Sequence, residues 1–298
     1  MVAQKSVVTA IGNFDGVHLG HQFLLRETAA FAEENDAVLG VVLFEPHPRR
    51  YFQPDAPPFL LTMPEKRDAL LRALGVQEIL TLTFDKALAS MTPEAFVHEV
   101  LAAKLSLGGV VAGADFRFGA KRAGDGAALR KLGEDAGLAV KLVELLDDQD
   151  GAAKFGSSAV REALRAGDAA EAAAMLGRSW SVTGIVLQGN QVGRTIGFPT
   201  ANMTLGDLVA PLQGVYATRV IVDGETYAAV SNYGRRPTVG SDAPLLETYL
   251  FDFDGDLYGR EIEVSFEAFL RDERKFDGLD ALKAQIADDC LKARKVLG

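Results

Sequence analysis

The sequence feature that most constrains the fold is a change in hydrophobic pattern near residue 180. Before that point, short apolar runs alternate with segments of helical period. The apolar runs cover residues 6–11, 37–44, 78–84 and 109–113, and the helical segments cover 18–34, 62–74 and 92–105. Continuous apolar strands that alternate with helices are typical of a parallel sheet covered on both faces. We therefore expect an α/β domain over residues 1–180, in which Thr62 caps the second helix.

After residue 180, strand-like segments follow one another with only turns between them. They cover residues 181–187, 215–222, 226–231, 246–251 and 262–269. Asp223-Gly224 is a tight hairpin signal between two of them, and only residues 279–296 have a strong helical period. A series of hairpins followed by one helix predicts an antiparallel β-barrel with a C-terminal helix over residues 181–298.

Composition excludes several classes of protein. The 31 basic and 41 acidic residues give a net charge of −10, whereas binding to nucleic acid requires clustered Lys and Arg that neutralise phosphates. Cys290 is the single cysteine, which excludes a disulfide framework and fits a reducing compartment. The sequence has no run of 18 apolar residues and no signal-peptide pattern at its start. We expect a cytoplasmic protein without a membrane or nucleic-acid partner.

Residues 12–21, between the first apolar run and the first helix, read GNFDGVHLGH. In an open parallel sheet, ligands bind outside the carboxyl ends of the strands. A helix that begins there offers free N–H groups and a positive dipole to a phosphate. His18 and His21 are three residues apart and share one face of the first helical turn. The segment therefore predicts a phosphate-binding turn in which both imidazoles contact phosphoryl oxygens.

Four segments, in order along the chain, resemble the motifs of one enzyme family. Residues 12–21 resemble the ATP-binding signature of the bacterial FAD synthetase family, within the nucleotidylyltransferase superfamily. Residues 113–119 (GADFRFG) resemble that family's second motif, and FEPHP resembles its FDPHP turn with Glu45 in place of Asp. Residues 157–161 (SSAVR) resemble its SSTxxR-type motif, with Gly156 and Ser158 in place of the usual Ser and Thr. The resemblance implies a Rossmann-like nucleotidylyltransferase domain that adenylylates FMN to FAD and releases pyrophosphate.

The same resemblance implies roles for individual residues of the first domain. His18 and His21 stabilise charge along the triphosphate, and Asp115 and His47 contact the flavin. The residues implied to bind ATP are Gly12, Phe14, His18, His21, Ser157, Ser158 and Arg161. From the residues alone, the two serines could equally cap the helix that follows them. The basic pairs Arg49-Arg50 and Lys121-Arg122 are candidate phosphate contacts that the sequence does not assign.

Residues 189–202 read GNQVGRTIGFPTAN, without the ending of a Walker A loop. The spaced glycines alone fit either a flexible hairpin or a loop that closes around phosphates. PTAN resembles the riboflavin kinase signature, which implies that Thr200 and Asn202 bind Mg²⁺ with ATP. The other residues implied to bind this ATP are Gly189, Gly193, Arg194 and Gly197.

Two further segments resemble the riboflavin kinase family. Glu247, in LLETYL, matches the family's catalytic glutamate, with Tyr249 in place of the usual His. A strand carboxylate facing a barrel pocket could accept the proton of the ribityl hydroxyl. Arg271, in LRDERKF, matches a segment that borders the flavin.

We therefore expect a bifunctional enzyme that makes FMN from riboflavin at residues 181–298 and FAD from FMN at residues 1–180. ATP is its cosubstrate, Mg²⁺ its cofactor, and small molecules its partners; a weak homo-oligomer stays open. Two alternatives remain. One is a nucleotidylyltransferase for another phosphorylated cofactor precursor, against which GADFRFG and PTAN argue. The other is a flavin-binding regulatory protein with a decayed kinase domain, against which the intact Thr200, Asn202 and Glu247 argue.

Overall fold

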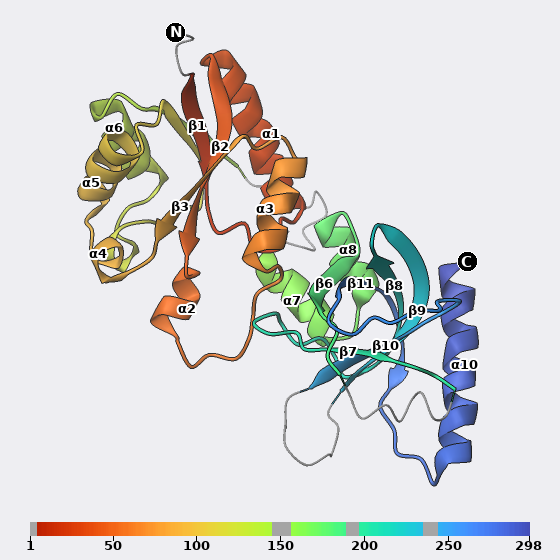
Figure 1. The fold of residues 1–298 in the computed structure, drawn as a ribbon. Helices are drawn as coiled ribbons and strands as arrows, with labels where there is room; N and C mark the ends of the chain where they lie inside the picture. The colour runs from red at the N-terminus through yellow and green to blue at the C-terminus, as the bar shows by residue number, and fades with distance from the viewer. Residues whose placement is uncertain (1–4, 145–155, 189–196, 235–243) are drawn as a thin grey trace. The chain divides into compact units, whose positions relative to one another are not determined.

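The structure is a computed structural model that describes residues 5–144, 156–188, 197–234 and 244–298 (Figure 1). It consists of two compact units. The first contains Met1–Pro57 and Pro64–Phe155, and the second contains Pro58–Met63 and Gly156–Gly298.

The first unit is built on a parallel sheet with strand order β3-β2-β1-β4-β5. The strands are β1 (Ser6–Ile11), β2 (Ala37–Glu45), β3 (Glu78–Thr83), β4 (Gly109–Gly113) and β5 (Ala139–Val143). All pairs between neighbouring strands are parallel, which confirms the predicted α/β fold. The strand order reverses between β1 and β4, and ligands bind at the carboxyl ends of strands at such a point.

Helices cover both faces of this sheet (Figure 1). They are α1 (Leu19–Glu34), α2 (Pro48–Phe52), α3 (Pro64–Ala73), α4 (Lys86–Ala89), α5 (Pro93–Ala95), the π-helix η1 (Phe96–Lys104), the short 3₁₀ turn η2 (Ala120–Arg122) and α6 (Gly126–Asp135). Leu24 and Leu25 of α1 pack with Val8 in one buried cluster. Val97 of η1 and Leu129 of α6 pack in a second cluster. Neither cluster includes the loop that follows β2, so this loop is available to form a site near the carboxyl end of the strand.

The second unit is built on a curled antiparallel sheet with strand order β6-β11-β8-β9-β10-β7. The strands are β6 (Trp180–Ile185), β7 (Ala201–Met203), β8 (Gly214–Val222), β9 (Glu225–Gly234), β10 (Leu245–Leu250) and β11 (Glu261–Asp272). The two ends of the sheet meet where the Leu187 N–H donates to the Asn202 carbonyl at 2.7 Å. This half-barrel agrees with the predicted antiparallel barrel.

Three helices complete the second unit: α7 (Ser157–Arg165), α8 (Ala169–Leu176) and the C-terminal α10 (Leu279–Leu297). Ala293 and Leu297 of α10 pack with Val215 and Ala217 of the sheet, as the predicted C-terminal helix requires (Figure 1).

The structure differs from the sequence prediction at several elements. The helix predicted from Thr62 begins two residues later, since α3 starts at Pro64, and the cap at Thr62 stays a prediction. Thr92 does cap α5, since its hydroxyl accepts the Ala95 N–H at 3.2 Å, but the chain then continues as a π-helix. The strands β5 and β7 were not predicted, because Lys141 interrupts the apolar run of β5 and β7 has only three residues.

Candidate active sites

The turn between β1 and α1 places two imidazoles at the carboxyl edge of the first sheet. His18 is the N-cap of α1, and its Nδ1 accepts the backbone N–H of His21 at 3.4 Å. The two rings stack with centroids 3.7 Å apart. Phe14 is fully buried, and its ring centroid lies 4.9 Å from that of His21. The predicted pair of histidines is therefore brought together, while Phe14 lies in the core and supports His21.

The backbone of this turn is strained. Phe14 and Val17 adopt φ values of 52° and 43°, a left-handed conformation that is costly for bulky and β-branched residues. The strain persists because Phe14 and Val17 are both buried in the core. Such over-determined strain is often found at functional sites.

His21 is electrostatically unusual. Its Nδ1 is buried and has no hydrogen-bond partner among the described residues. Burial, and secondly the neighbouring His18, hold the pKa of His21 well below its ordinary value. The imidazole is therefore neutral in the free protein at pH 7. An adjacent anionic ligand would raise this pKa, because a negative charge favours the protonated ring.

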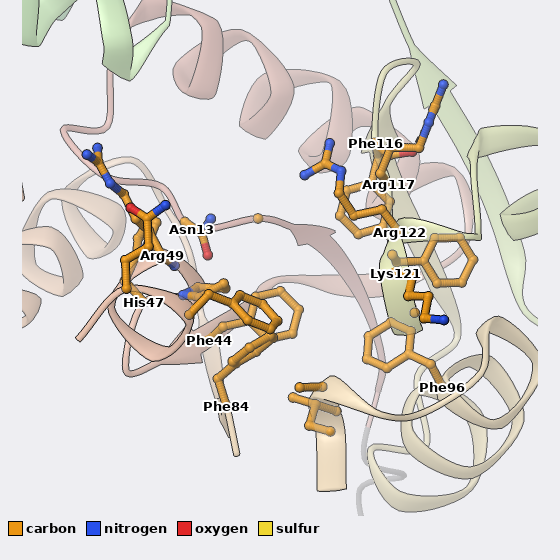
Figure 2. A pocket seen from close by; sticks show the side chains of 18 of the residues that line it. Asn13, Phe44, His47, Arg49, Phe84, Phe96, Phe116, Arg117, Lys121 and Arg122 are labelled. Atoms are coloured by element: carbon orange, nitrogen blue, oxygen red, sulfur yellow. Dashed lines mark hydrogen bonds between the residues drawn. The ribbon is translucent and has the colours of Figure 1, made fainter. Parts of the chain in front are cut away.

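A cavity of about 740 Å³ opens in the first unit (Figure 2). Figure 2 shows Asn13, His47 and Arg49 on one side and Phe116, Arg117, Lys121 and Arg122 on the other. Its aromatic lining includes Phe44, Phe84 and Phe96. An apolar cavity of this size with a few convergent charged groups is typical of a small-molecule site.

The cavity brings together several residues that the sequence predicted. Gly12, His47 and Asp115 all line it. Of the unassigned basic pairs, Arg49, Lys121 and Arg122 line the cavity as well. Arg50 does not, because its Nη1 donates to the carbonyls of Pro54 and Ala56 at 3.2 and 2.6 Å.

Sequence reasoning missed several polar residues of the cavity, among them Asn13 and Arg117. Arg117 and Asn13 line it, and the Oδ1 of Asn13 is buried without a hydrogen-bond partner among the described residues. Asn13 lies in the motif at residues 12–21, and Arg117 lies in the motif at residues 113–119. Their position inside these motifs could have predicted that they belong to the site.

Glu45, which departs from the family motif, has a structural role. Its carboxylate accepts a hydrogen bond from Arg67 Nη2 at 2.6 Å, and Arg67 is only 7% exposed. This ion pair fixes the end of β2, directly before His47 and Arg49.

The second segment predicted to bind ATP for adenylylation lies at the start of α7. The helix begins at Ser157 with Gly156 at the N-cap, so the alternative that the serines cap a helix beginning at residue 159 is wrong. The Nε of Arg161 donates to the Phe59 carbonyl at 2.6 Å, and its guanidinium lies 5.6 Å from the Phe59 ring centroid. These residues pack within the second unit and do not line the 740 Å³ cavity.

The second unit places Asn202 and Glu247 side by side. They are directly opposite in the register of β7 and β10, so their side chains share one face of the sheet at a Cβ separation of about 5 Å. Asn202 is buried, and its Oδ1 has no hydrogen-bond partner among the described residues. Its Nδ2 donates to the Thr200 carbonyl at 3.5 Å. Gly197 has a φ of 89°, whereas Gly189, Gly193 and Arg194 lie outside the described residues.

Tyr249 lies on the same face of β10 as Glu247. Its ring contacts those of Phe198 and Phe251 edge-on, at 5.4 and 5.8 Å between centroids. Tyr249, which stands where the family motif has His, therefore belongs to a group of three aromatic rings.

Arg271 is held by a carboxylate of the C-terminal helix. Its Nη2 lies 2.7 Å from Asp289 Oδ2, and its guanidinium lies 5.8 Å from the Phe276 ring centroid. Two residues after Arg271, Glu273 accepts a hydrogen bond from Asn232 Nδ2 at 3.3 Å.

These two sites define a class: an enzyme with one nucleotide-binding parallel sheet and a second site on an antiparallel half-barrel. Comparisons specify it further. A family model described as FAD synthetase matches residues 1–158, and one described as riboflavin kinase matches residues 176–297. The chain belongs to the family of bifunctional riboflavin kinase/FMN adenylyltransferases, and both predicted activities are confirmed in the predicted order.

Curated relatives span nearly the whole chain. The bifunctional riboflavin kinase/FMN adenylyltransferase of Escherichia coli (strain K12) is 40% identical over 296 residues, which is 99% of this chain and 94% of that protein. The protein of the same description from Bacillus subtilis (strain 168) is 37% identical over 96% of this chain and 91% of that protein.

A solved structure supports the fold. The one described as "Crystal Structure of Macrolide-efflux Protein from Streptococcus pneumoniae" aligns with a TM-score of 0.87 and 31% identity, over 99% of this chain and 95% of that chain. Within the described residues, none of the helices has the length and apolar character needed to cross a membrane.

Proposed function

We propose that FMN is adenylylated in the 740 Å³ cavity and at the turn that carries His18 and His21. The observation that supports this most is the position of the cavity beside the β1–α1 turn, at the reversal of strand order. The aromatic lining suits an isoalloxazine ring, and Arg49, Lys121 and Arg122 suit the FMN phosphate. Asp115 and His47 contact the flavin side.

In the proposed reaction, an oxygen of the FMN phosphate attacks the α-phosphorus of ATP. The bond from that phosphorus to the bridging oxygen breaks, and pyrophosphate leaves. The neutral His21, whose buried Nδ1 has no protein partner among the described residues, binds the triphosphate with His18. The N–H groups at the start of α1 favour the same negative charge. Ser157, Ser158 and Arg161 stay predicted ATP contacts.

We further propose that riboflavin is phosphorylated on the half-barrel, with Glu247 as general base. Its carboxylate accepts the proton of the ribityl hydroxyl as that oxygen attacks the γ-phosphorus, and ADP leaves. Glu247 lies opposite Asn202 in the register, which supports a shared site for the base and the nucleotide. Gly197 belongs to the predicted phosphate-binding loop.

Mg²⁺ fits the residues of this second site. Mg²⁺ prefers oxygen ligands and keeps several waters while it shares substrate phosphates. The buried Asn202 Oδ1, which has no protein partner among the described residues, is such a ligand, and the hydroxyl of Thr200 would be the second. Bound Mg²⁺ would neutralise charge on the phosphates.

A single substitution tests the first site. His21→Ala should lower FAD and pyrophosphate formation from FMN and ATP on the order of 10²- to 10³-fold, because a donor near developing phosphate charge is lost. Formation of ADP from riboflavin and ATP should be unchanged. His98, which is exposed on η1, provides the matched control His98→Ala. Wild-type FAD formation in His21→Ala would contradict the proposed site.

A further inference from the structure

The end of β11 is tied to the C-terminal helix by a buried carboxylate. Asp289 is 2% exposed. It accepts hydrogen bonds from Arg271 Nε at 2.9 and 3.1 Å, from Arg271 Nη2 at 2.7 Å, and from Gln285 Nε2 at 2.7 Å. A buried carboxylate with this many donors holds its partners firmly, because separating Asp289 from Arg271 would leave an uncompensated buried charge.

The same cluster holds the loop that follows β11. Gln285 Oε1 accepts a hydrogen bond from Arg274 Nη2. Arg271 and Arg274 both lie against the Phe276 ring, at 5.8 and 5.0 Å from its centroid. Asp289 and Gln285 therefore set the positions of the two guanidinium groups that contact Phe276.

The loop also reaches the row of side chains that contains Glu247. Asn232 is directly opposite Glu247 in the register of β9 and β10, and its Nδ2 donates to Glu273 Oε1. A Cβ atom at Gly234 would overlap the Glu273 carboxylate, so the absence of a side chain there makes room for this contact. The loop after β11 is therefore bonded to helix α10 through Gln285 and to strand β9 through Asn232.

We propose that Asp289 is a positioning residue of the kinase site, which holds the Arg271–Phe276 loop as the wall that receives riboflavin. The inference rests on the proposed kinase site around Glu247. Phe276 supplies the aromatic ring of this loop, and Glu273 is bonded to Asn232, which lies opposite the proposed base. The Arg271 guanidinium does not bind riboflavin directly in this proposal, because its Nε and Nη2 are already bonded to Asp289. It holds Phe276 in place instead.

Asp289→Asn in the full chain is the principal test. The substitution keeps the size of the side chain but removes the charge that holds Arg271. We expect the riboflavin KM to rise about tenfold, with kcat and the ATP KM within about twofold of wild type. Conversion of FMN to FAD should be unchanged, because the cavity proposed for FMN is lined by residues of the first unit. An unchanged riboflavin KM in the folded variant would overturn the proposal, and so would an equal loss of both activities.

An exposed residue of the same helix provides a matched control. Asp280 lies in the first turn of α10 and is exposed. Asp280→Asn should leave every kinetic constant at the wild-type value. A rise in the riboflavin KM equal to that of Asp289→Asn would overturn the proposal, because any loss of charge on the helix would then suffice.

A double variant separates positioning from direct contact. If Arg271 acts through Asp289, Arg271→Lys combined with Asp289→Asn should raise the riboflavin KM no further than the larger single effect. Effects that multiply would mean that Arg271 binds riboflavin independently, which contradicts the proposal.

A milder variant tests the proposal if Asp289→Asn does not fold. Gln285→Leu removes one donor to Asp289 but leaves the pair with Arg271, and it should raise the riboflavin KM about threefold. If Asp289→Asn is unfolded by circular dichroism, a wild-type riboflavin KM in Gln285→Leu would overturn the proposal. Glu247→Gln, measured in parallel, reports kcat and thereby tests the proposed base separately from the riboflavin KM.

Discussion

At the scale of single residues, buried polar atoms without hydrogen-bond partners among the described residues are found at both proposed sites. Most buried polar groups in folded proteins are hydrogen-bonded, and leaving one unpaired costs about 1–3 kcal/mol. Among the described residues, His21 Nδ1 and Asn13 Oδ1 are such atoms in the first unit, and Asn202 Oδ1 is one in the second. A substrate or ion that binds them would recover this free energy.

The lowered pKa of His21 predicts a pH dependence of stability. Burial and His18 lower this pKa, so below about pH 6.5 the unfolded state binds a proton that the folded state does not. The stabilisation is complete above pH 6.5 and is lost as pH falls. The free energy of unfolding should fall by up to about 1.4 kcal/mol per pH unit from this group. Urea denaturation from pH 7 to 5 should show a shallower decline in His21→Asn, and equal slopes would contradict the prediction.

Glu247→Gln should reduce only the kinase activity. Glutamine keeps the shape of the side chain but cannot accept the proton, and loss of a general base typically costs about 10²- to 10⁴-fold in rate. Riboflavin phosphorylation should fall by that factor, while conversion of FMN to FAD continues. Glu261→Gln, an exposed strand residue, is the control. Phosphorylation at the wild-type rate would show that Glu247 is not the base.

At the scale of elements, the short helix α2 shows how a turn selects one of two adjacent arginines for the site. His47 caps the helix, since its Nδ1 accepts the Arg49 N–H at 3.0 Å. The side chain of Arg49 lines the cavity, whereas Arg50 bonds to two loop carbonyls. The sequence could not separate them, because the difference depends on where the chain turns after Phe52.

Arg49→Gln should therefore raise the KM for FMN in FAD synthesis, about tenfold for one lost charge-assisted contact worth about 1.5 kcal/mol. The KM for riboflavin should not change. Arg50→Gln should leave the FMN KM near wild type and lower the thermal midpoint slightly, because its bonds stabilise the loop. Equal effects of the two variants on the FMN KM would contradict this assignment.

The predictability of each element follows from its length and its dependence on distant contacts. The strands β1 and β4 were predicted at their observed bounds, since continuous apolar runs between glycines and turns leave little choice. The cavity residues Asn13 and Arg117 were missed, because their exposure to the cavity depends on tertiary packing. The Arg271–Asp289 pair joins residues 18 apart through the path of α10, and no sequence spacing reveals it.

At the scale of the whole molecule, the chain does not divide at one point into two compact pieces. Pro58–Met63 belongs to the second unit, where the N–H groups of Phe59 and Leu60 donate to the Asp207 carbonyl and Leu60 accepts from Val209. Residues 156–180 pack with the same unit, although the motif at 157–161 is that of the adenylyltransferase. The functional boundary at residue 180 therefore stays a prediction, and it differs from the boundary of compact packing.

This arrangement predicts that a fragment of residues 156–298 is less stable than the same unit in the full chain. The fragment loses the hydrogen bonds of Pro58–Met63, including that from Trp180 Nε1 to the Leu61 carbonyl at 2.9 Å. It also loses the fully buried side chains of Phe59 and Leu61, each worth about 1.5–3 kcal/mol of burial. We expect a loss of several kcal/mol in the free energy of unfolding.

Trp180 is the single tryptophan of the chain and is 2% exposed, so its fluorescence reports unfolding of the second unit alone. In urea, the fluorescence midpoint of the fragment should lie well below that of the full chain, and its emission before unfolding should already be shifted toward that of a solvated indole. Fusing residues 58–63 to the fragment through a flexible linker should recover part of the difference, whereas a linker of the same length without them should not. A fragment as stable as the full chain would show that this segment contributes nothing, and that the unit folds from residues 156–298 alone.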